Sequence, residues 1–74
     1  MELNDFIKDF ADQFDETAIS EFSPETHFRD LDEWGSLTGL AVLNMIKSKY
    51  KVQVTAEKLL TISTIKELFD FIQK

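Results

Sequence analysis

Apolar residues recur at every third or fourth position near both ends of this 74-residue chain, and this spacing constrains the fold more than any other feature. A period of three to four residues places side chains on one face of an α-helix. In the first segment the apolar positions are Leu3, Phe6, Ile7, Phe10 and Phe14. In the last segment they are Ile65, Leu68, Phe69 and Ile72, with Phe71 near the margin of the face. Both segments are therefore predicted to be amphipathic helices whose apolar faces form the core.

A third segment, residues 36–50, is predicted to be a central helix that is apolar nearly all round. The stripe expected to face the core is formed by Leu43, Ile46 and Tyr50. A second stripe, expected to stay partly exposed, is formed by Leu37, Leu40, Ala41 and Asn44, with Val42 and Met45 between the two. An exposed apolar stripe suggests a docking surface. A central helix packed on three sides remains the alternative.

Two threonines mark the starts of helices in the last third of the chain. Thr55 is placed to cap a short helix over residues 56–61 that would bury Leu59 and Leu60. The stretch Thr64–Glu67 has the spacing of a capping box, which predicts the start of the last helix.

Residues 15–35 show no sustained period and are predicted to be a long connection. Pro24 disfavours helix before it, so any helical turn in this segment should be short. The apolar residues expected to hold the segment on the core are Ile19, Phe22, Phe28, Leu31 and Trp34. Loops of this length are uncommon unless they are functional, and this one leads directly to Ser36.

The composition supports a helical fold, since the chain has 43% hydrophobic residues, only two glycines and no dipeptide typical of a β-hairpin. We expect an all-α, small four-helix bundle with three longer helices and one short third helix. A chain of this length forms one domain at most, so residues 1–74 are predicted to be a single domain. We also expect the protein to be a monomer.

The net charge of −6 is unevenly distributed. Residues 1–34 contain eleven acidic and two basic residues, whereas residues 35–74 contain three acidic residues and six lysines. The acidic half would repel nucleic acid and the lysines are dispersed, so nucleic-acid binding is not expected. Basic proteins are the expected partners. The alternative is that the carboxylates only keep a small domain soluble.

Several chemistries lack their usual residues in this chain. There is no cysteine, and His27 is the one histidine, so neither a thiolate nucleophile nor a metal-binding cluster is expected. A hydrolase using Ser36 and His27 would need a third group to orient the histidine, and none is evident. The chain is therefore predicted not to be an enzyme.

No segment approaches the run of about 18 apolar residues that spans a bilayer. The N-terminal residues are acidic, whereas a signal peptide begins with basic ones. The sequence therefore predicts a soluble, cytoplasmic domain.

Ser36 stands at the first position of the central helical pattern, and two readings of it remain open. A serine there can be a helix cap, in an unmodified helical module that binds a partner protein. It can also be an attachment point for a group that brings the chemistry the chain lacks.

A set of residues in the loop and central helix forms a recognisable pattern: Phe28, Leu31, Ser36, Leu37, Leu40, Leu43, Ile46 and Tyr50. Together with the length, the acidity and the order of helices, this pattern resembles the acyl carrier protein family over essentially the whole chain. The resemblance implies that Ser36 carries 4′-phosphopantetheine, donated by coenzyme A, and that acyl groups are held as thioesters on its thiol. It implies a role in fatty-acid, polyketide or related biosynthesis and in lipid metabolism.

The resemblance also implies which proteins would bind this chain. They are a phosphopantetheinyl transferase and the acyl-transferring and synthase enzymes that dock on the central helix. By resemblance, the residues that contact them are Asp32, Glu33, Leu37, Leu40, Ala41 and Asn44.

The chain departs from the family pattern in two places. Gly35 stands where the family usually has aspartate, and residues 36–50 contain no carboxylate where the family usually has several. Three explanations for Gly35 remain open: a specialised carrier with its own transferase, a carrier-like domain that is no longer modified, and an altered sequence. Because residues 36–50 contain no carboxylate, partners are expected to recognise apolar contacts and the acidic residues just before the helix, Asp30, Asp32 and Glu33.

Overall fold

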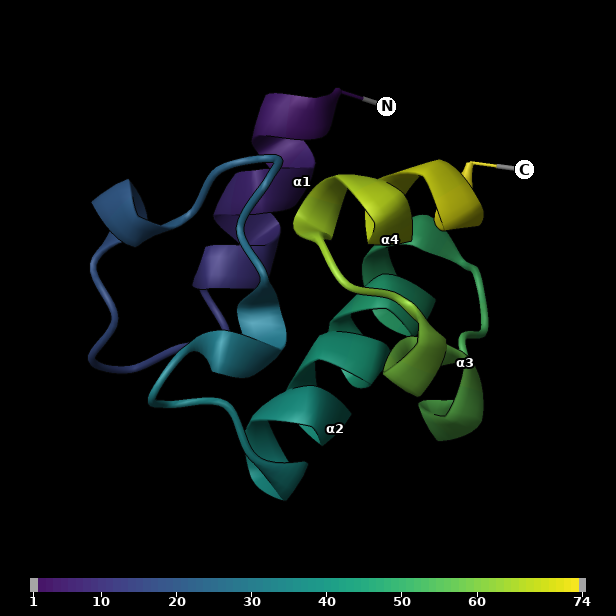
Figure 1. Ribbon diagram of the computed structural model, residues 1–74. Coiled ribbons are helices and arrows are strands. Elements are labelled where there is room, and N and C mark those ends of the chain that lie inside the picture. The colour runs from purple at the N-terminus through teal and green to yellow at the C-terminus, as the bar shows by residue number, and fades with distance from the viewer. Residues whose placement is uncertain (1, 74) are drawn as a thin grey trace.

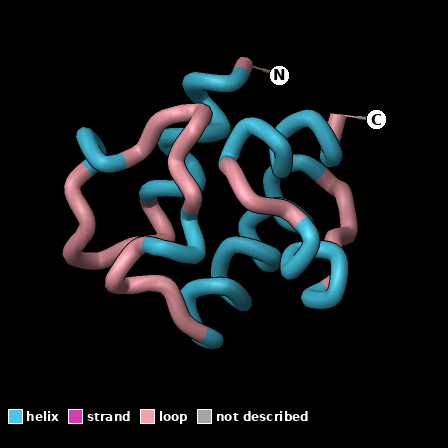
Figure 2. Tube along the Cα trace, viewed as in Figure 1, coloured by secondary structure: helices cyan, strands magenta, loops and turns pink. Residues whose placement is uncertain are grey.

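The computed structural model describes residues 2–73 and places four α-helices around one core (Figure 1). The helices are α1 (Leu3–Ala11), α2 (Ser36–Met45), α3 (Ala56–Thr61) and α4 (Ile65–Ile72). Within residues 2–73 there is no strand, and the helices are joined by loops (Figure 2). The predicted all-α bundle with a short third helix is confirmed.

The first helix packs its aromatic face into the core as predicted but is shorter than its apolar pattern. Phe6, Ile7 and Phe10 are buried, while α1 ends at Ala11. Phe14 lies beyond the helix, where its amide donates to the carbonyl of Ala11 over 2.9 Å in a tight turn. That turn returns the Phe14 ring to the core, so the residue is buried without being helical.

The central helix spans the predicted residues but buries a different face. α2 continues into a π-helical turn, η3 (Ile46–Tyr50), which ends at Lys51 in the left-handed conformation. The core-facing residues of this segment are Gly39, Val42, Met45 and Ile46. Of the predicted core stripe, Ile46 is fully buried, whereas Leu43 and Tyr50 pack against the core and stay partly exposed. α1 packs against α2 near Val42 and Met45, which lie between the two stripes predicted from the sequence. Because the helix is apolar nearly all round, its periodicity does not indicate which side faces the core.

The end of η3 is tied to α1 by a polar contact at the edge of the core. The Asp9 carboxylate accepts hydrogen bonds from the Tyr50 hydroxyl at 2.5 Å and from the Lys49 ammonium at 2.9 Å. The Tyr50 bond is the main cause that lowers the pKa of Asp9 below its usual value, and burial raises the pKa of Tyr50. This contact joins two elements that are 40 residues apart in the chain.

Both predicted helix caps in the last third of the chain are confirmed. The Thr55 hydroxyl accepts from the amide of Lys58, and Thr64 with Glu67 forms a complete capping box. α4 buries the four predicted apolar residues. The prediction that α3 buries two leucines was half wrong: Leu59 is buried, whereas Leu60 is 69% exposed. A six-residue helix lying on one neighbour has only one covered side, and consecutive residues point about 100° apart.

The long connection has two short 3₁₀ turns, η1 (Ile19–Glu21) and η2 (Phe28–Asp30). This confirms the prediction, made from Pro24, that any helical turn in this segment is short. It is held on the core by aromatic rings. Phe10 lies 5.5 Å from Phe28 and 6.4 Å from Trp34 between ring centroids, and Phe28 lies 4.9 Å from Trp34. The expectation that Ile19 anchors the loop was wrong, because its side chain is 57% exposed.

A polar contact fastens the same connection to the other side of the molecule. The Arg29 guanidinium donates to the carbonyls of Leu59, Leu60 and Ile62 at distances from 2.6 to 3.1 Å. These carbonyls lie at the C-terminal end of α3, where a cation is favoured by the helix dipole. Arg29 therefore sets where α3 lies relative to the loop.

Phe10 contacts five other aromatic rings, so its truncation should damage both the core and the loop. We expect Phe10→Ala to lower the free energy of unfolding by about 3–5 kcal/mol, because a buried ring is lost and a cavity remains. Urea denaturation followed by circular dichroism measures this. Phe71→Ala is the control, since its ring is only partly buried and should cost less than half as much. Equal losses in the two variants would contradict the central role of Phe10.

Candidate functional site

Ser36 is the first residue of α2 and is exposed. The N-cap position is held by Gly35, so the alternative in which Ser36 is the helix cap is wrong. The residue before it, Gly35, is fully extended with φ −168° and ψ −173°, and no side chain caps the helix. The first amides of a helix have no acceptor within the helix, so the start of α2 retains free hydrogen-bond donors. A Cβ added at Gly35 would meet no atom within 4 Å. The Ser36 hydroxyl therefore stands in an open position beside unused donors and the positive end of a helix dipole.

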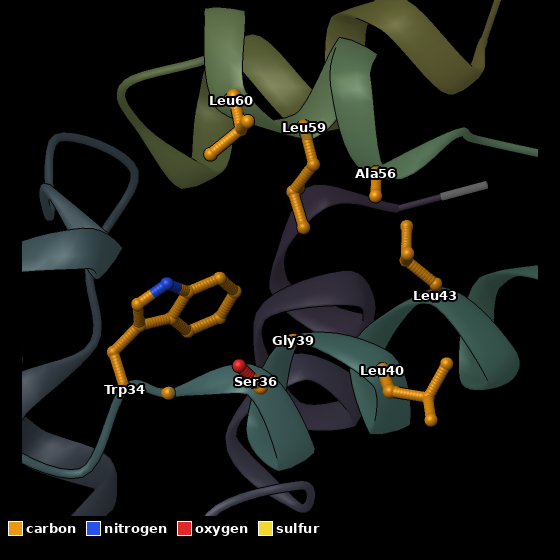
Figure 3. A pocket seen from close by; sticks show the side chains of 9 residues that line it. Trp34, Ser36, Gly39, Leu40, Leu43, Ala56, Leu59 and Leu60 are labelled. Carbon is orange, nitrogen blue, oxygen red and sulfur yellow. The ribbon is translucent and has the colours of Figure 1, made fainter.

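An apolar groove lies beside Ser36, between α2 and α3 (Figure 3). Its volume is about 410 Å³. The Trp34 indole closes one side, Leu59 and Leu60 project from α3, and Leu40 and Leu43 from α2 (Figure 3). The floor is Gly39, whose missing side chain leaves space below the Trp34 ring: an added Cβ would lie 3.4 Å from it.

The predicted docking stripe of α2 is largely exposed. Leu37 is 85% exposed, Leu40 is 55% exposed and Asn44 is exposed, whereas Ala41 is half-buried. Leu60 of α3 adds a residue to this surface that the sequence did not indicate. The structure therefore brings leucines from two helices together near Ser36, around the mouth of the groove.

The two acidic residues expected to contact partners occupy different environments. Asp32 is exposed and has no hydrogen-bond partner among residues 2–73. The Glu33 carboxylate instead accepts four hydrogen bonds from the chain itself. Oε2 accepts from the amide of Asp15 at 2.6 Å, and Oε1 accepts from the amides of Glu16 and Thr17 at 3.0 and 2.9 Å. Oε1 also accepts from the Thr17 hydroxyl at 2.7 Å. Glu33 thus ties the start of the long loop to its end.

These hydrogen bonds stabilise the ionised form of Glu33. They hold the pKa of Glu33 below its ordinary value of 4.5. The hydrogen bond from the Thr17 hydroxyl lowers the pKa most, followed by those from the amides of Glu16, Asp15 and Thr17. The sequence shows an acidic residue in an acidic stretch, and nothing in it indicates a contact 16 to 18 residues upstream.

The lowered pKa of Glu33 predicts a pH dependence of stability. Because the folded-state pKa lies below the unfolded value, the stabilisation is complete above about pH 4.5 and is lost as the pH falls through the folded-state pKa. We expect Glu33→Gln to be less stable at neutral pH and to lose less stability between about pH 5 and pH 3. Urea denaturation at a series of pH values measures the slope.

Glu25→Gln is the matched control for this measurement. It removes one exposed carboxyl that accepts no hydrogen bond within residues 2–73, so the slope should stay that of the unsubstituted protein. A Glu33→Gln slope equal to that of the control would show that the four hydrogen bonds do not stabilise the fold in solution.

His27 is not placed as a partner for Ser36. Its backbone forms an isolated antiparallel bridge with Thr64, and no hydrogen bond within the described chain joins its side chain to the serine. The structure gives no support to the serine hydrolase alternative.

The walls of the groove were missed by sequence reasoning. Trp34 and Leu59 were expected only as core residues, and Gly39 was given no role. A signal existed for Gly39, since glycine inside a helix costs about 1 kcal/mol relative to alanine and is often retained for packing. The side of the groove formed by α3 depends on how that helix packs, which no local pattern encodes.

The comparisons with known proteins give one match, to a protein family. The model of the family described as "phosphopantetheine attachment site" matches residues 5–72, which is most of the chain. The chain therefore belongs to this family, the carrier domain of acyl carrier proteins. Its cofactor is covalently attached 4′-phosphopantetheine. No curated protein and no solved structure was found to match the chain.

Domains of this family are carriers that work with transferase and synthase enzymes. No helix within residues 2–73 has the length and apolar character needed to cross a membrane.

Proposed function

We propose that Ser36 is the residue to which 4′-phosphopantetheine is attached and that the protein carries acyl intermediates for fatty-acid, polyketide or related biosynthesis. The observation that carries the proposal is the position of Ser36: an exposed serine at the uncapped start of α2, inside a chain that matches the phosphopantetheine attachment family. The prosthetic group supplies a terminal thiol on which acyl groups are held as thioesters.

The loading reaction needs only a hydroxyl from this chain. Ser36 Oγ forms a bond to the phosphorus that bears the pantetheine of coenzyme A, and the bond between that phosphorus and the bridging oxygen breaks. Adenosine 3′,5′-bisphosphate leaves, and the proton of the hydroxyl passes to a base of the transferase. The open backbone at Gly35 leaves room for this approach.

The start of α2 also suits the product. A phosphodiester on Ser36 carries one negative charge beside free amides and the positive end of the helix dipole, and such an interaction is worth about 0.3–1 kcal/mol when exposed. The apolar groove offers contact to whatever is attached at Ser36. In this proposal the chain presents the acyl intermediates as a monomeric carrier, and separate enzymes in the cytoplasm, which it visits in turn, do the chemistry.

The exposed stripe of α2 is the proposed docking surface for those enzymes. Leu37 and Leu40, flanked by Ala41 and Asn44, would lie against the partner, and Asp32 would meet basic groups near the serine. Residues 36–50 contain no carboxylate, so apolar contact contributes more than charge along the helix itself. The side chain of Glu33 is already occupied, which makes it a poorer contact than Asp32.

The attachment site is tested by intact mass after incubation with coenzyme A and a broad-specificity phosphopantetheinyl transferase. We expect the unsubstituted protein to gain the mass of one phosphopantetheine group and Ser36→Ala to gain none. Gly35→Asp should fold, because its side chain meets open space, and should be loaded at least as fast.

Two results would contradict this assignment. A mass gain in Ser36→Ala would place the attachment elsewhere. An unchanged mass for the unsubstituted protein, with a gain for Gly35→Asp, would show that the chain with glycine before the serine is not an efficient carrier.

The docking surface is tested by the same reaction measured at several carrier concentrations. We expect Leu40→Glu to raise the KM for the carrier by about tenfold, since a central apolar contact is replaced by a charge. Ile19→Glu is a matched control, because Ile19 is equally exposed (57% against 55%) but lies in η1, away from α2 (Figure 1). An equal change in KM for the two variants would show that the transferase does not bind the exposed surface of α2.

A further inference from the structure

The Glu33 side chain joins two segments that are distant in sequence immediately before the proposed attachment site. Both of its oxygens are engaged, by three consecutive amides of residues 15–17 and by the Thr17 hydroxyl. Three consecutive N–H groups converging on one carboxylate restrain it in position and direction more strongly than a single contact would. We call this set of hydrogen bonds the Glu33 clasp.

The main chain of Glu33 is connected to the first turn of α2. Its carbonyl accepts a hydrogen bond from the Thr38 hydroxyl at 3.0 Å, so the same residue holds the loop on one side and the helix on the other. The next residue, Trp34, donates its amide to the carbonyl of Leu31 at 3.0 Å and packs its ring against Phe28. Ser36 follows two residues later.

Between these contacts and the serine lies only Gly35. It has no side chain, its neighbourhood is open, and α2 has no side-chain cap. Glycine has the widest backbone freedom of all residues, so nothing at position 35 itself restricts how the chain enters the helix. The direction in which Ser36 is presented therefore depends on the residues that fix both ends of this short segment, and Glu33 contributes to both.

We propose that Glu33 is a positioning residue for the loading of Ser36, acting through its clasp on residues 15–17 rather than by contact with the transferase. The proposal rests on the attachment of phosphopantetheine to Ser36. A nucleophile must reach the phosphorus in a narrow range of distances and directions, and a displacement of about 1 Å can cost on the order of 100-fold in rate. The clasp restricts that displacement in a chain whose glycine would otherwise permit it.

The test separates positioning from binding. Initial rates of phosphopantetheinyl transfer are measured against carrier concentration for the unsubstituted protein and for Glu33→Gln, which keeps the size of the side chain but removes its charge. Positioning predicts that kcat falls by about tenfold while the KM for the carrier changes less than twofold, because the lost restraint matters in the transition state. Hydrogen exchange of the amides of residues 15–17 should become faster in the same variant, which reports the clasp independently of loading.

Thr17 provides a second, milder variant on the other side of the clasp. Thr17→Val removes the hydroxyl donor without changing the charge, and should lower kcat by a smaller factor, whereas Thr17→Ser keeps the donor and should restore the rate. Thr17→Val also keeps the test decisive if Glu33→Gln does not fold. Glu25→Gln, with the same loss of charge at an exposed position, should leave kcat and KM unchanged.

Each other outcome overturns the proposal in a recognisable way. A raised KM with unchanged kcat in Glu33→Gln would mean that Glu33 contacts the transferase directly. Unchanged kinetics in Glu33→Gln and Thr17→Val would mean that the clasp is structural only. Failure of the unsubstituted protein to be loaded at all would remove the carrier function itself, and the positioning role with it.

Discussion

The structure depends most on the burial of aromatic rings around Phe10. This ring contacts Phe6 on its own helix, Phe14 in the turn that follows the helix, and three rings of the long connection, including Trp34. The connection between α1 and α2 has few hydrogen bonds of regular structure, so its conformational entropy must be offset mainly by apolar burial. Since Trp34 stands two residues before Ser36, the same burial that holds the loop also holds the segment that leads to the proposed attachment serine.

The aromatic core holds the long loop in place, and two polar contacts fix the positions of the loop and of α3 more closely. Glu33 joins the two ends of the long loop, and Arg29 joins the loop to the C-terminal end of α3. Apolar burial is non-directional, whereas hydrogen bonds to charged groups have defined geometry. The groove lies between α2 and α3, and these contacts set the position of its loop side and its α3 side. The groove beside Ser36 is therefore held by the aromatic rings around Phe10 and by a few directional hydrogen bonds.

Several large apolar side chains stay exposed on the proposed docking surface. Leu40 and Leu60 remain exposed beside the groove, Leu37 is exposed in the first turn of α2, and the start of α2 has no capping side chain. Each of these features lowers the stability of an isolated domain, because apolar area stays in water and helix amides lack acceptors. The proposed function accounts for them, since partners would dock on this surface and the prosthetic group would be attached at the start of the helix. The apolar α2 face without carboxylates distinguishes this chain from the acidic pattern usual in its family.

The sequence by itself determined where the helices form, the Thr55 and Thr64 caps and the family, because periodicity, capping spacing and the pattern around Ser36 are local properties of the chain. It also identified most of the exposed α2 stripe. It did not determine which arc of α2 faces the core, that Leu60 is exposed, that Ile19 is not an anchor, or that Glu33 binds residues 15–17. Those were decided by the tertiary structure, since each depends on how segments far apart in the chain pack against each other. The groove beside Ser36 is the clearest case, because its walls come from the loop, α2 and α3, and no single segment encodes it.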